Sequence, residues 1–151
     1  RLLRQTREHG KGGGPEGLGG GRSMAERITF AGPRRGADLD ACYADADLLV
    51  LPSRGESYGM VVTEALARGI PVVGTDAQGL PEALGRAPDG DLPGILVPPD
   101  DPGALADALR GWLSRAELRE RLRQAARQRR AELTGWETTS MVIAKVLEAH
   151  G

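Results

Sequence analysis

The sequence predicts an α/β protein in which a parallel sheet is covered by helices on both faces. Two observations lead to this prediction. Short continuous apolar runs, at Leu48–Leu51 and in residues 71–73, are typical of strands buried on both faces of a sheet. Segments with helical spacing of their apolar residues separate these runs, and strands that alternate with helices form βα units. The predicted fold is therefore a Rossmann-like sheet that ends in several helices.

The expected elements can be placed in order along the chain. The opening residues, RLLRQTREHG, suggest the end of a helix, and residues 11–22, KGGGPEGLGGGR, suggest a flexible surface loop. This loop lacks the Lys-Ser/Thr pair of a phosphate-binding P-loop, so we do not expect it to bind phosphate. We then expect strands at residues 28–30, Leu48–Leu51, 71–73 and Gly94–Val97, and helices at residues 37–46, 59–68 and Leu80–Leu84.

The last third of the chain is expected to be helical. Asp101 can cap a helix whose first residue is Pro102, because the Asp side chain accepts hydrogen bonds from the free N–H groups of a first turn. Helical spacing assigns one apolar stripe to Leu105, Leu109, Trp112 and Leu113, a second to Leu118, Leu122 and Ala125, and a separate final helix to Trp136, Val142, Ile143, Val146 and Leu147.

Composition and charge exclude several classes of protein. The 151 residues fit one domain, and the formal net charge of −1 provides no general attraction to nucleic acid or membrane. No apolar run approaches the roughly 20 residues that span a bilayer. The chain has no initiator Met and no apolar signal-peptide core, so it resembles a piece of a longer, cytoplasmic protein. Its single cysteine, Cys42, excludes a disulfide framework and a Cys-based zinc site.

Two loops lie where a parallel sheet binds its ligands. LPSRGESYG joins the Leu48–Leu51 strand to the helix at residues 59–68, and GTDAQGLPE joins the next strand to the Leu80–Leu84 helix. Ligands of such sheets bind beyond the carboxyl ends of the strands, and helix N-termini attract anions. Two such ends side by side could hold a diphosphate. Neither loop has the G-x-G-x-x-G pattern of an ordinary NAD site.

Glu56 and Glu64 stand out because they lie at this helix. Val61, Val62, Ala65 and Leu66 form its expected buried face, so Glu64 faces either solvent or the wall of a cleft. Glu56 precedes the helix, where an acid is favourable in itself. From the residues alone, helix-end stabilisation and a surface acid are as good an explanation as a binding site.

The spacing of the two acids changes this balance. Glu-x7-Glu, preceded by PS and followed by an apolar strand, stands in LPSRGESYGMVVTEALARGIPVVGTDAQGLPE, residues 51–82. The segment resembles the signature of retaining glycosyltransferases of the GT-B fold, family 4 type. RITFAGPRRGADLDACYADADLLVLPS before it, and GILVPPDDPGALADALRGWL and LTGWETTSMVIAKVLE after it, are similar to the family's C-terminal, donor-binding domain. The resemblance implies that residues 23–151 form this domain and that the N-terminal acceptor domain is missing.

The resemblance also implies a role for each matching residue. Glu64 would accept hydrogen bonds from both ribose hydroxyls of a nucleotide sugar. Glu56, the catalytic residue, would accept hydrogen bonds from hydroxyls of the transferred sugar and stabilise its developing positive charge. The nucleobase of the donor would lie near the loop after Phe30. The remaining donor-binding residues would be Ser57, Tyr58, Gly59, Met60 and Val61, with Gln78, Gly79 and Leu80 shaping the neighbouring turn.

The implied reaction is transfer of a sugar, of hexosyl type, from a nucleoside diphosphate to an acceptor with retention of anomeric configuration. Helix dipoles and basic side chains would stabilise the leaving group, so no metal and no other cofactor is expected. Asp45 and Asp47 in ADAD form no convincing metal-ligand pair, because they stand at a helix-to-strand junction. The expected partners are the nucleotide-sugar donor and the missing domain of the same enzyme, with no nucleic acid.

Two departures and three alternatives qualify the resemblance. The family usually has Gly-Gly where this chain has Gln78-Gly79. The acceptor site and the diphosphate-binding Arg and Lys of the family belong to the missing part, so we expect no transfer and at best weak nucleotide binding by these residues alone. The alternatives are a non-catalytic nucleotide-binding module, a GT-B sugar-nucleotide epimerase and, from the Arg-rich residues 115–130, contact with a membrane surface or nucleic acid. A solvated basic face is the better explanation of those arginines.

Overall fold

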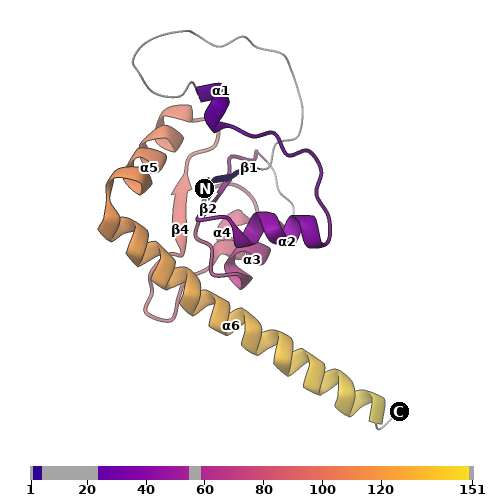
Figure 1. Ribbon diagram of the computed structural model, residues 1–151. Coiled ribbons are helices and arrows are strands. Elements are labelled where there is room, and N and C mark those ends of the chain that lie inside the picture. Colours follow the sequence, from indigo (N-terminus) through magenta and orange to yellow (C-terminus); the bar gives the residue numbers. More distant parts are fainter. Residues whose placement is uncertain (1, 5–23, 55–58, 150–151) are drawn as a thin grey trace.

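The computed structural model describes residues 2–4, 24–54 and 59–149, and the side chains of most of these up to residue 133. Figure 1 shows the described elements in chain order. They are β1 (Leu2–Arg4), α1 (Met24–Arg27), α2 (Ala37–Ala44), β2 (Leu48–Leu51), α3 (Met60–Ala67), β3 (Val72–Thr75), α4 (Leu80–Leu84), β4 (Gly94–Val97), α5 (Pro102–Ser114) and α6 (Ala116–Ala149).

Within these ranges the strands form one parallel sheet of order β1-β2-β3-β4. Val50 is paired with Val73, and Val73 in turn with Ile95, so the three apolar runs lie side by side. All residues of β2 and β3 are buried, as expected for strands covered on both faces. The predicted fold class, a Rossmann-like α/β sheet with helices on both faces, is confirmed.

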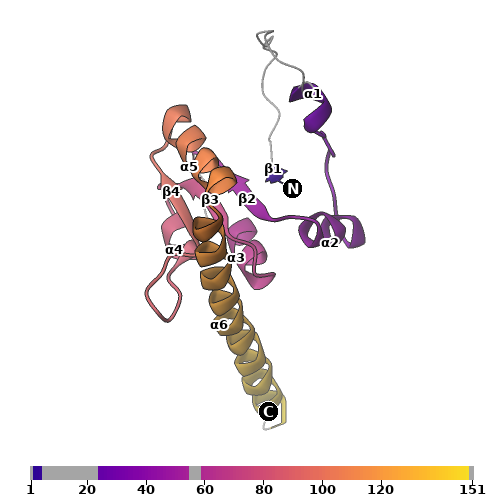
Figure 2. The same ribbon diagram turned by 60° about the vertical axis from the view of Figure 1, so that its left-hand side comes forward.

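Alternate residues of the strands supply two separate hydrophobic clusters. Leu49, Leu51 and Val72 pack in a first cluster with side chains of α3 and α4. Leu48, Val50 and Val73 pack in a second cluster with Trp112 of α5. Successive side chains of a strand point to opposite faces, so each strand contributes to both layers. Figure 2 shows α5 separated from α3 and α4 by the strands.

Helix α6 joins the two clusters. Leu122 packs in the second cluster, and Ala126, one turn later, packs in the first. The sequence predicted a separate final helix, which is wrong: residues 116–149 form one helix of 34 residues. Gly135 lies inside this helix, and a glycine within a helix costs only about 1 kcal/mol, which does not suffice to end it.

The expected strand at residues 28–30 does not form. These residues have no regular structure, and the side chain of Phe30 is 81% exposed. The edge of β2 is taken instead by Leu2–Arg4, where the end of a helix was expected. A short apolar segment becomes a strand only where a free sheet edge accepts its hydrogen bonds, and in the described part of the chain β1 holds that edge.

The other elements lie close to their predicted positions. The side chain of Asp101 accepts a hydrogen bond from Ala104 N at 2.9 Å and Pro102 begins α5, which confirms the predicted cap. Leu113 is an exception to the predicted stripe, since it is 67% exposed while the neighbouring Trp112 is buried. The buried stripe is therefore narrower than predicted. The glycine-rich residues 11–22 lie outside the described ranges.

Candidate functional site

The candidate site lies at the carboxyl edge of the sheet, where β2 and β3 lead into α3 and α4. Gly59 precedes α3 with a φ of 56°, in the left-handed region that favours glycine. A Cβ atom on Gly59 would lie 2.3 Å from the Cβ of Ala83 in α4. Glycine at this position therefore allows the start of α3 to approach α4 closely. Because Gly59 has no side chain, it cannot cap the free N–H groups in the first turn of α3.

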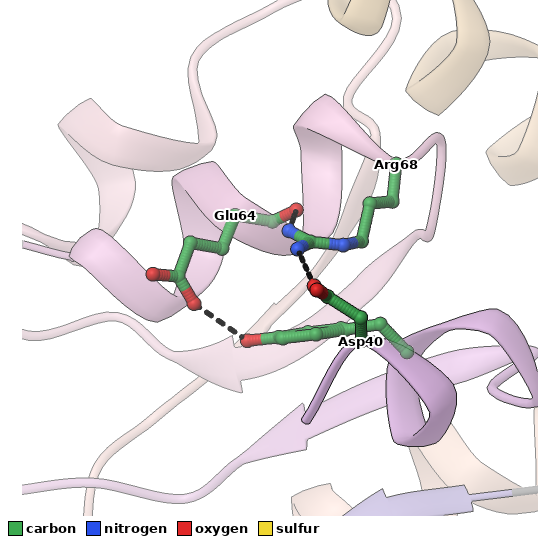
Figure 3. A network of polar contacts seen from close by, with 4 residues as sticks. Asp40, Glu64 and Arg68 are labelled. Atoms are coloured by element: carbon green, nitrogen blue, oxygen red, sulfur yellow. Dashed lines mark hydrogen bonds and ion pairs between the residues drawn. The ribbon is translucent and has the colours of Figure 1, made fainter. Parts of the chain in front are cut away.

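Glu64 lies in the second turn of α3 and is half-buried. The hydroxyl of Tyr43, from α2, donates a hydrogen bond to Glu64 Oε2 at 3.0 Å. Among the described residues, Oε1 of Glu64 has no hydrogen-bond partner, and in Figure 3 it points away from Tyr43. A carboxylate held by one oxygen, with the other available, can accept hydrogen bonds from hydroxyl groups of a ligand.

Tyr43 is buried, with 3% of its surface exposed. Burial, followed by the hydrogen bond to the Glu64 carboxylate, raises the pKa of its phenol from 10.0 to about 12. The phenol is therefore a proton donor to Glu64 throughout the neutral pH range.

Arg68 connects the helices that carry this pair. Its Nη1 donates to the backbone oxygen of Glu64 at 3.1 Å, and its Nη2 lies 2.6 Å from Oδ1 of Asp40 in α2. The guanidinium carbon also lies 4.5 Å from the centre of the Tyr43 ring, within the range of a cation–π contact. Figure 3 shows Arg68 bonded to the backbone of Glu64 and to Asp40, and this network links α2 to α3.

The other predicted site residues are placed differently. Glu56, Ser57 and Tyr58 lie outside the described residues. The side chain of Met60 is 68% exposed, and Val61 is half-buried against the first cluster.

The three predicted donor-binding residues in the turn before α4 differ in their exposure. Gln78 is exposed and has a φ of 48°, which is unusual for a residue other than glycine, and Gly79 beside it is half-buried. Leu80 is 1% exposed and belongs to the first cluster, so its side chain cannot line a ligand pocket. Its backbone N–H donates to Ala77 O at 3.3 Å. Leu80 therefore stabilises the turn by packing in the core and by its backbone hydrogen bond.

A cavity of about 250 Å³ opens at the same edge of the sheet, on the side of α5, and the sequence did not predict it. Thr75 at the end of β3 donates a hydrogen bond to the backbone oxygen of Ser53, and Arg54 Nε lies 2.5 Å from Asp100 Oδ1. Thr75, Arg54, Asp100 and Asp101, four polar residues that line this cavity, are therefore already bonded within the chain. The cavity is lined by Pro52, Ser53, Arg54, Thr75, Val97, Pro98, Asp100, Asp101, Pro102 and Leu105.

Arginines of α6 are largely engaged within the molecule. Arg119 donates to the backbone oxygens of Trp112 and Leu113, both at 2.9 Å. Arg123 lies 3.2 Å from Asp47, and Arg129 lies 2.6 Å from Glu132. These contacts within the molecule account for many of the arginines, so a membrane or nucleic acid is not needed to explain them. None of the described helices is both long enough and apolar enough to cross a membrane.

In the described ranges, no three His, Cys, Asp or Glu side chains gather as metal ligands would. Of the two aspartates of ADAD, Asp47 forms an ion pair with Arg123.

Sequence reasoning found Glu64 but missed the residues that hold it. Tyr43 and Asp40 lie in the predicted helix at residues 37–46, and no motif in the sequence points to them or to Arg68. A buried tyrosine usually needs a partner for its hydroxyl, and this was the one available hint. The partner is 21 residues further along the chain, so it could not be identified from local pattern.

Comparison with known proteins agrees with this geometry. Residues 21–129 match the family described as "Glycosyl transferases group 1". Two D-inositol 3-phosphate glycosyltransferases are similar in sequence. The one from Salinispora tropica is 35% identical over 150 residues, covering 92% of this chain and 30% of the relative. The one from Saccharomonospora viridis is 38% identical over 117 residues, covering 78% and 26%.

Solved structures of similar fold include two further proteins. Sucrose-phosphate synthase from Thermosynechococcus elongatus superposes with a TM-score of 0.64 at 31% identity, over 83% of this chain and 31% of that one. Anabaena HepE in complex with UDP superposes with a TM-score of 0.63 at 26% identity, over 83% and 33%. The chain thus spans about a third of the length of these proteins. The family match covers well over half of the chain, and the chain belongs to the glycosyl transferases group 1 family.

Proposed function

We propose that this chain is the C-terminal, donor-binding domain of a retaining glycosyltransferase of family 4 type, and that it binds a nucleoside diphosphate sugar. The observation that carries the proposal is the Glu64 carboxylate, fixed through one oxygen at the ligand-binding edge of the sheet while the other has no partner in the described part of the chain. Similarity to HepE, whose structure holds UDP, supports the class of ligand.

In this proposal Glu64 accepts hydrogen bonds from the ribose hydroxyls. A carboxylate is an acceptor only: Oε1 is open, and Oε2, which accepts from Tyr43, has a second lone pair, so two neighbouring hydroxyls can donate one to each oxygen. Hydrogen bonds to a charged group are about twice as strong as those between neutral groups. A half-buried carboxylate on a helix is therefore well suited to select a ribose.

The diphosphate would face the start of α3. The N–H groups of a first helical turn have no partner within the helix and carry partial positive charge, and Gly59 leaves them uncovered. Gln78, Gly79 and the backbone of Met60 and Val61 would border the same space. Glu56 remains the proposed residue for contact with the transferred hexosyl group.

Nucleotide titration tests the proposal. The 151-residue chain, labelled with ¹⁵N, is titrated with UDP, GDP and ADP, and the tightest-binding nucleotide is then used with Glu64→Ala. Loss of charged hydrogen bonds should weaken binding about tenfold or more. Glu117→Ala, an exposed acid at the start of α6, is the matched control and should leave the affinity unchanged. An absence of binding to all three nucleotides, or equal affinity of Glu64→Ala and the wild type, would contradict the proposal.

The proposal also concerns the reaction. The acceptor site of this type of enzyme belongs to its other domain, so we expect nucleotide binding by these 151 residues without sugar transfer. A radiolabelled transfer assay on the chain checks this expectation, and turnover would refute it. No metal is proposed in the donor site, so treatment with EDTA should leave the nucleotide affinity unchanged.

A further inference from the structure

We infer that Tyr43 is a positioning residue, which with Arg68 fixes the Glu64 carboxylate in the orientation that distinguishes a ribose from a 2′-deoxyribose. The inference rests on the proposed function and deepens it. It assigns a role in donor recognition to a residue of α2, a helix that supplies no contact to the donor in that proposal.

The first step is the direction of the hydrogen bond. Tyr43 donates to Oε2 of Glu64, and a phenol that keeps its proton can only be a donor to a carboxylate. One oxygen of Glu64 is therefore oriented by the protein, and the side chain is held away from the many rotamers that a free glutamate visits. The other oxygen keeps both of its lone pairs for a ligand, and Oε2 keeps its second one.

The second step is the rigidity of Tyr43 itself. Its ring is buried in the first hydrophobic cluster beside Leu66 and Leu49, so the hydroxyl has little freedom to move. Arg68 lies over the ring at 4.5 Å and is in turn held by the Glu64 backbone and by Asp40. The phenol hydroxyl is therefore held in one position. Two contacts connect α2 to α3 and the residue after it: Tyr43 with Glu64, and Asp40 with Arg68.

The third step concerns what such a fixed carboxylate recognises. Paired hydrogen bonds to two adjacent hydroxyls need both carboxylate oxygens at defined positions, because hydrogen bonds weaken steeply as their angles depart from linearity. A carboxylate that rotates freely still binds one hydroxyl, but it loses most of its preference for a ligand with two adjacent hydroxyls over a ligand with one. Removal of the Tyr43 hydroxyl should therefore reduce selectivity for ribose more than it reduces affinity for the rest of the nucleotide.

The experiment measures that selectivity. Dissociation constants of UDP, GDP and ADP and of their 2′-deoxy counterparts are measured by calorimetry for the wild type, Tyr43→Phe, Glu64→Gln and the double variant. We expect the wild type to prefer the ribonucleotide about tenfold, and Tyr43→Phe to prefer it less than about threefold with little change for the deoxynucleotide. The double variant should be no worse than Glu64→Gln alone. Ser114→Ala, which removes a hydroxyl on α5, should keep the full preference.

Two results would overturn the inference while leaving the proposed function intact. One is an unchanged ribose preference in Tyr43→Phe, and the other is an equal loss of affinity for both sugars, as a merely structural role predicts. Arg68→Met is the second variant, in case Tyr43→Phe does not fold. It removes the group above the ring but keeps the hydroxyl, and should lower the preference in the same direction by a smaller factor.

A readout without ligand separates the inference from the proposed function. The three-bond couplings along the Glu64 side chain, from Hα–Hβ to Hβ–Hγ and to the carboxyl carbon, should indicate by NMR one rotamer in the wild type and averaging in Tyr43→Phe. A single rotamer in both proteins would refute the positioning role even if no nucleotide bound. Failure of the wild type to bind any of the nucleotides, with Glu64 ordered by Tyr43, would instead refute the proposed function and with it the role in ribose selection.

Discussion

At the scale of single residues, the buried phenol of Tyr43 makes stability depend on alkaline pH. Burial and the Glu64 carboxylate raise its pKa from 10.0 to about 12, so the folded chain keeps this proton where the unfolded chain loses it. The contribution is fully present below pH 10 and is lost as the pH rises towards 12. Urea unfolding at pH 9, 10 and 11 should show a steeper fall in the free energy of unfolding for the wild type than for Tyr43→Phe. Parallel pH profiles of the two proteins would contradict this account.

Gly59 carries a second prediction at this scale. Gly59→Ala should destabilise the chain by about 2–4 kcal/mol, because it combines a left-handed φ with a clash against Ala83. Gly69→Ala is the matched control: its φ is 71°, but the added Cβ would meet side chains at ordinary contact distances. It should cost only the backbone term, about 1 kcal/mol. Urea unfolding measures both, and equal losses would show that the contact with α4 is not tight.

Gln78 marks a limit of reading single residues from sequence. The family resemblance implied that glycine is usual at this position, and the left-handed φ of 48° provides the physical reason. Glu64 could likewise be placed off the buried face from helical spacing alone. Its bond with Tyr43 could not, because the partner comes from another helix and their approach depends on how α2 and α3 pack.

At the scale of elements, α5 offers a test of capping. Asp101→Ala removes the acceptor of the Ala104 N–H and should cost about 1 kcal/mol of unfolding free energy. Asp101→Asn keeps a side-chain oxygen at the same place and should cost clearly less. Thermal unfolding followed by circular dichroism compares the two variants. Equal losses would show that charge near the helix end, not the hydrogen bond, is what stabilises α5.

The elements differ in how well sequence predicts them, and the reason is their environment. The inner strands β2 and β3 were predicted because strands covered on both faces are apolar along their length, and β4 next to them carries a similar apolar run. The segment at residues 28–30 has the same apolar character but depends on a free sheet edge, which local pattern does not reveal. Leu113 fits helical spacing as well as Trp112, but the surface under α5 is too narrow to cover both.

At the scale of the whole molecule, α6 determines how the layers are held together. It contributes Leu122 to the cluster under α5 and Ala126 to the cluster under α3 and α4. Figures 1 and 2 both show it running from α5 past α3. The proposed ligand-binding edge draws on both layers, since α3 carries Glu64 while the neighbouring cavity borders α5. Its geometry therefore depends on the two layers keeping their relative position.

If α6 couples the layers, damage to one cluster should be felt in the other. Leu66→Ala removes a fully buried side chain from the first cluster and should cost about 2–5 kcal/mol. With Trp136 replaced by phenylalanine, fluorescence of Trp112 reports on the second cluster alone. Its urea transition should shift to the same lower midpoint as the circular dichroism signal, because the shared helix leaves no stable half.

The exposed Leu113 provides the matched control for this test. Leu113→Ala, in the same Trp136→Phe background, removes the same side chain from a 67% exposed position and should move both transitions by less than about 0.5 kcal/mol. The opposite outcome for Leu66→Ala would be a Trp112 transition that stays at the wild-type midpoint while the circular dichroism signal falls in two steps. That result would mean that each face of the sheet unfolds independently and that α6 rests on the layers without joining them.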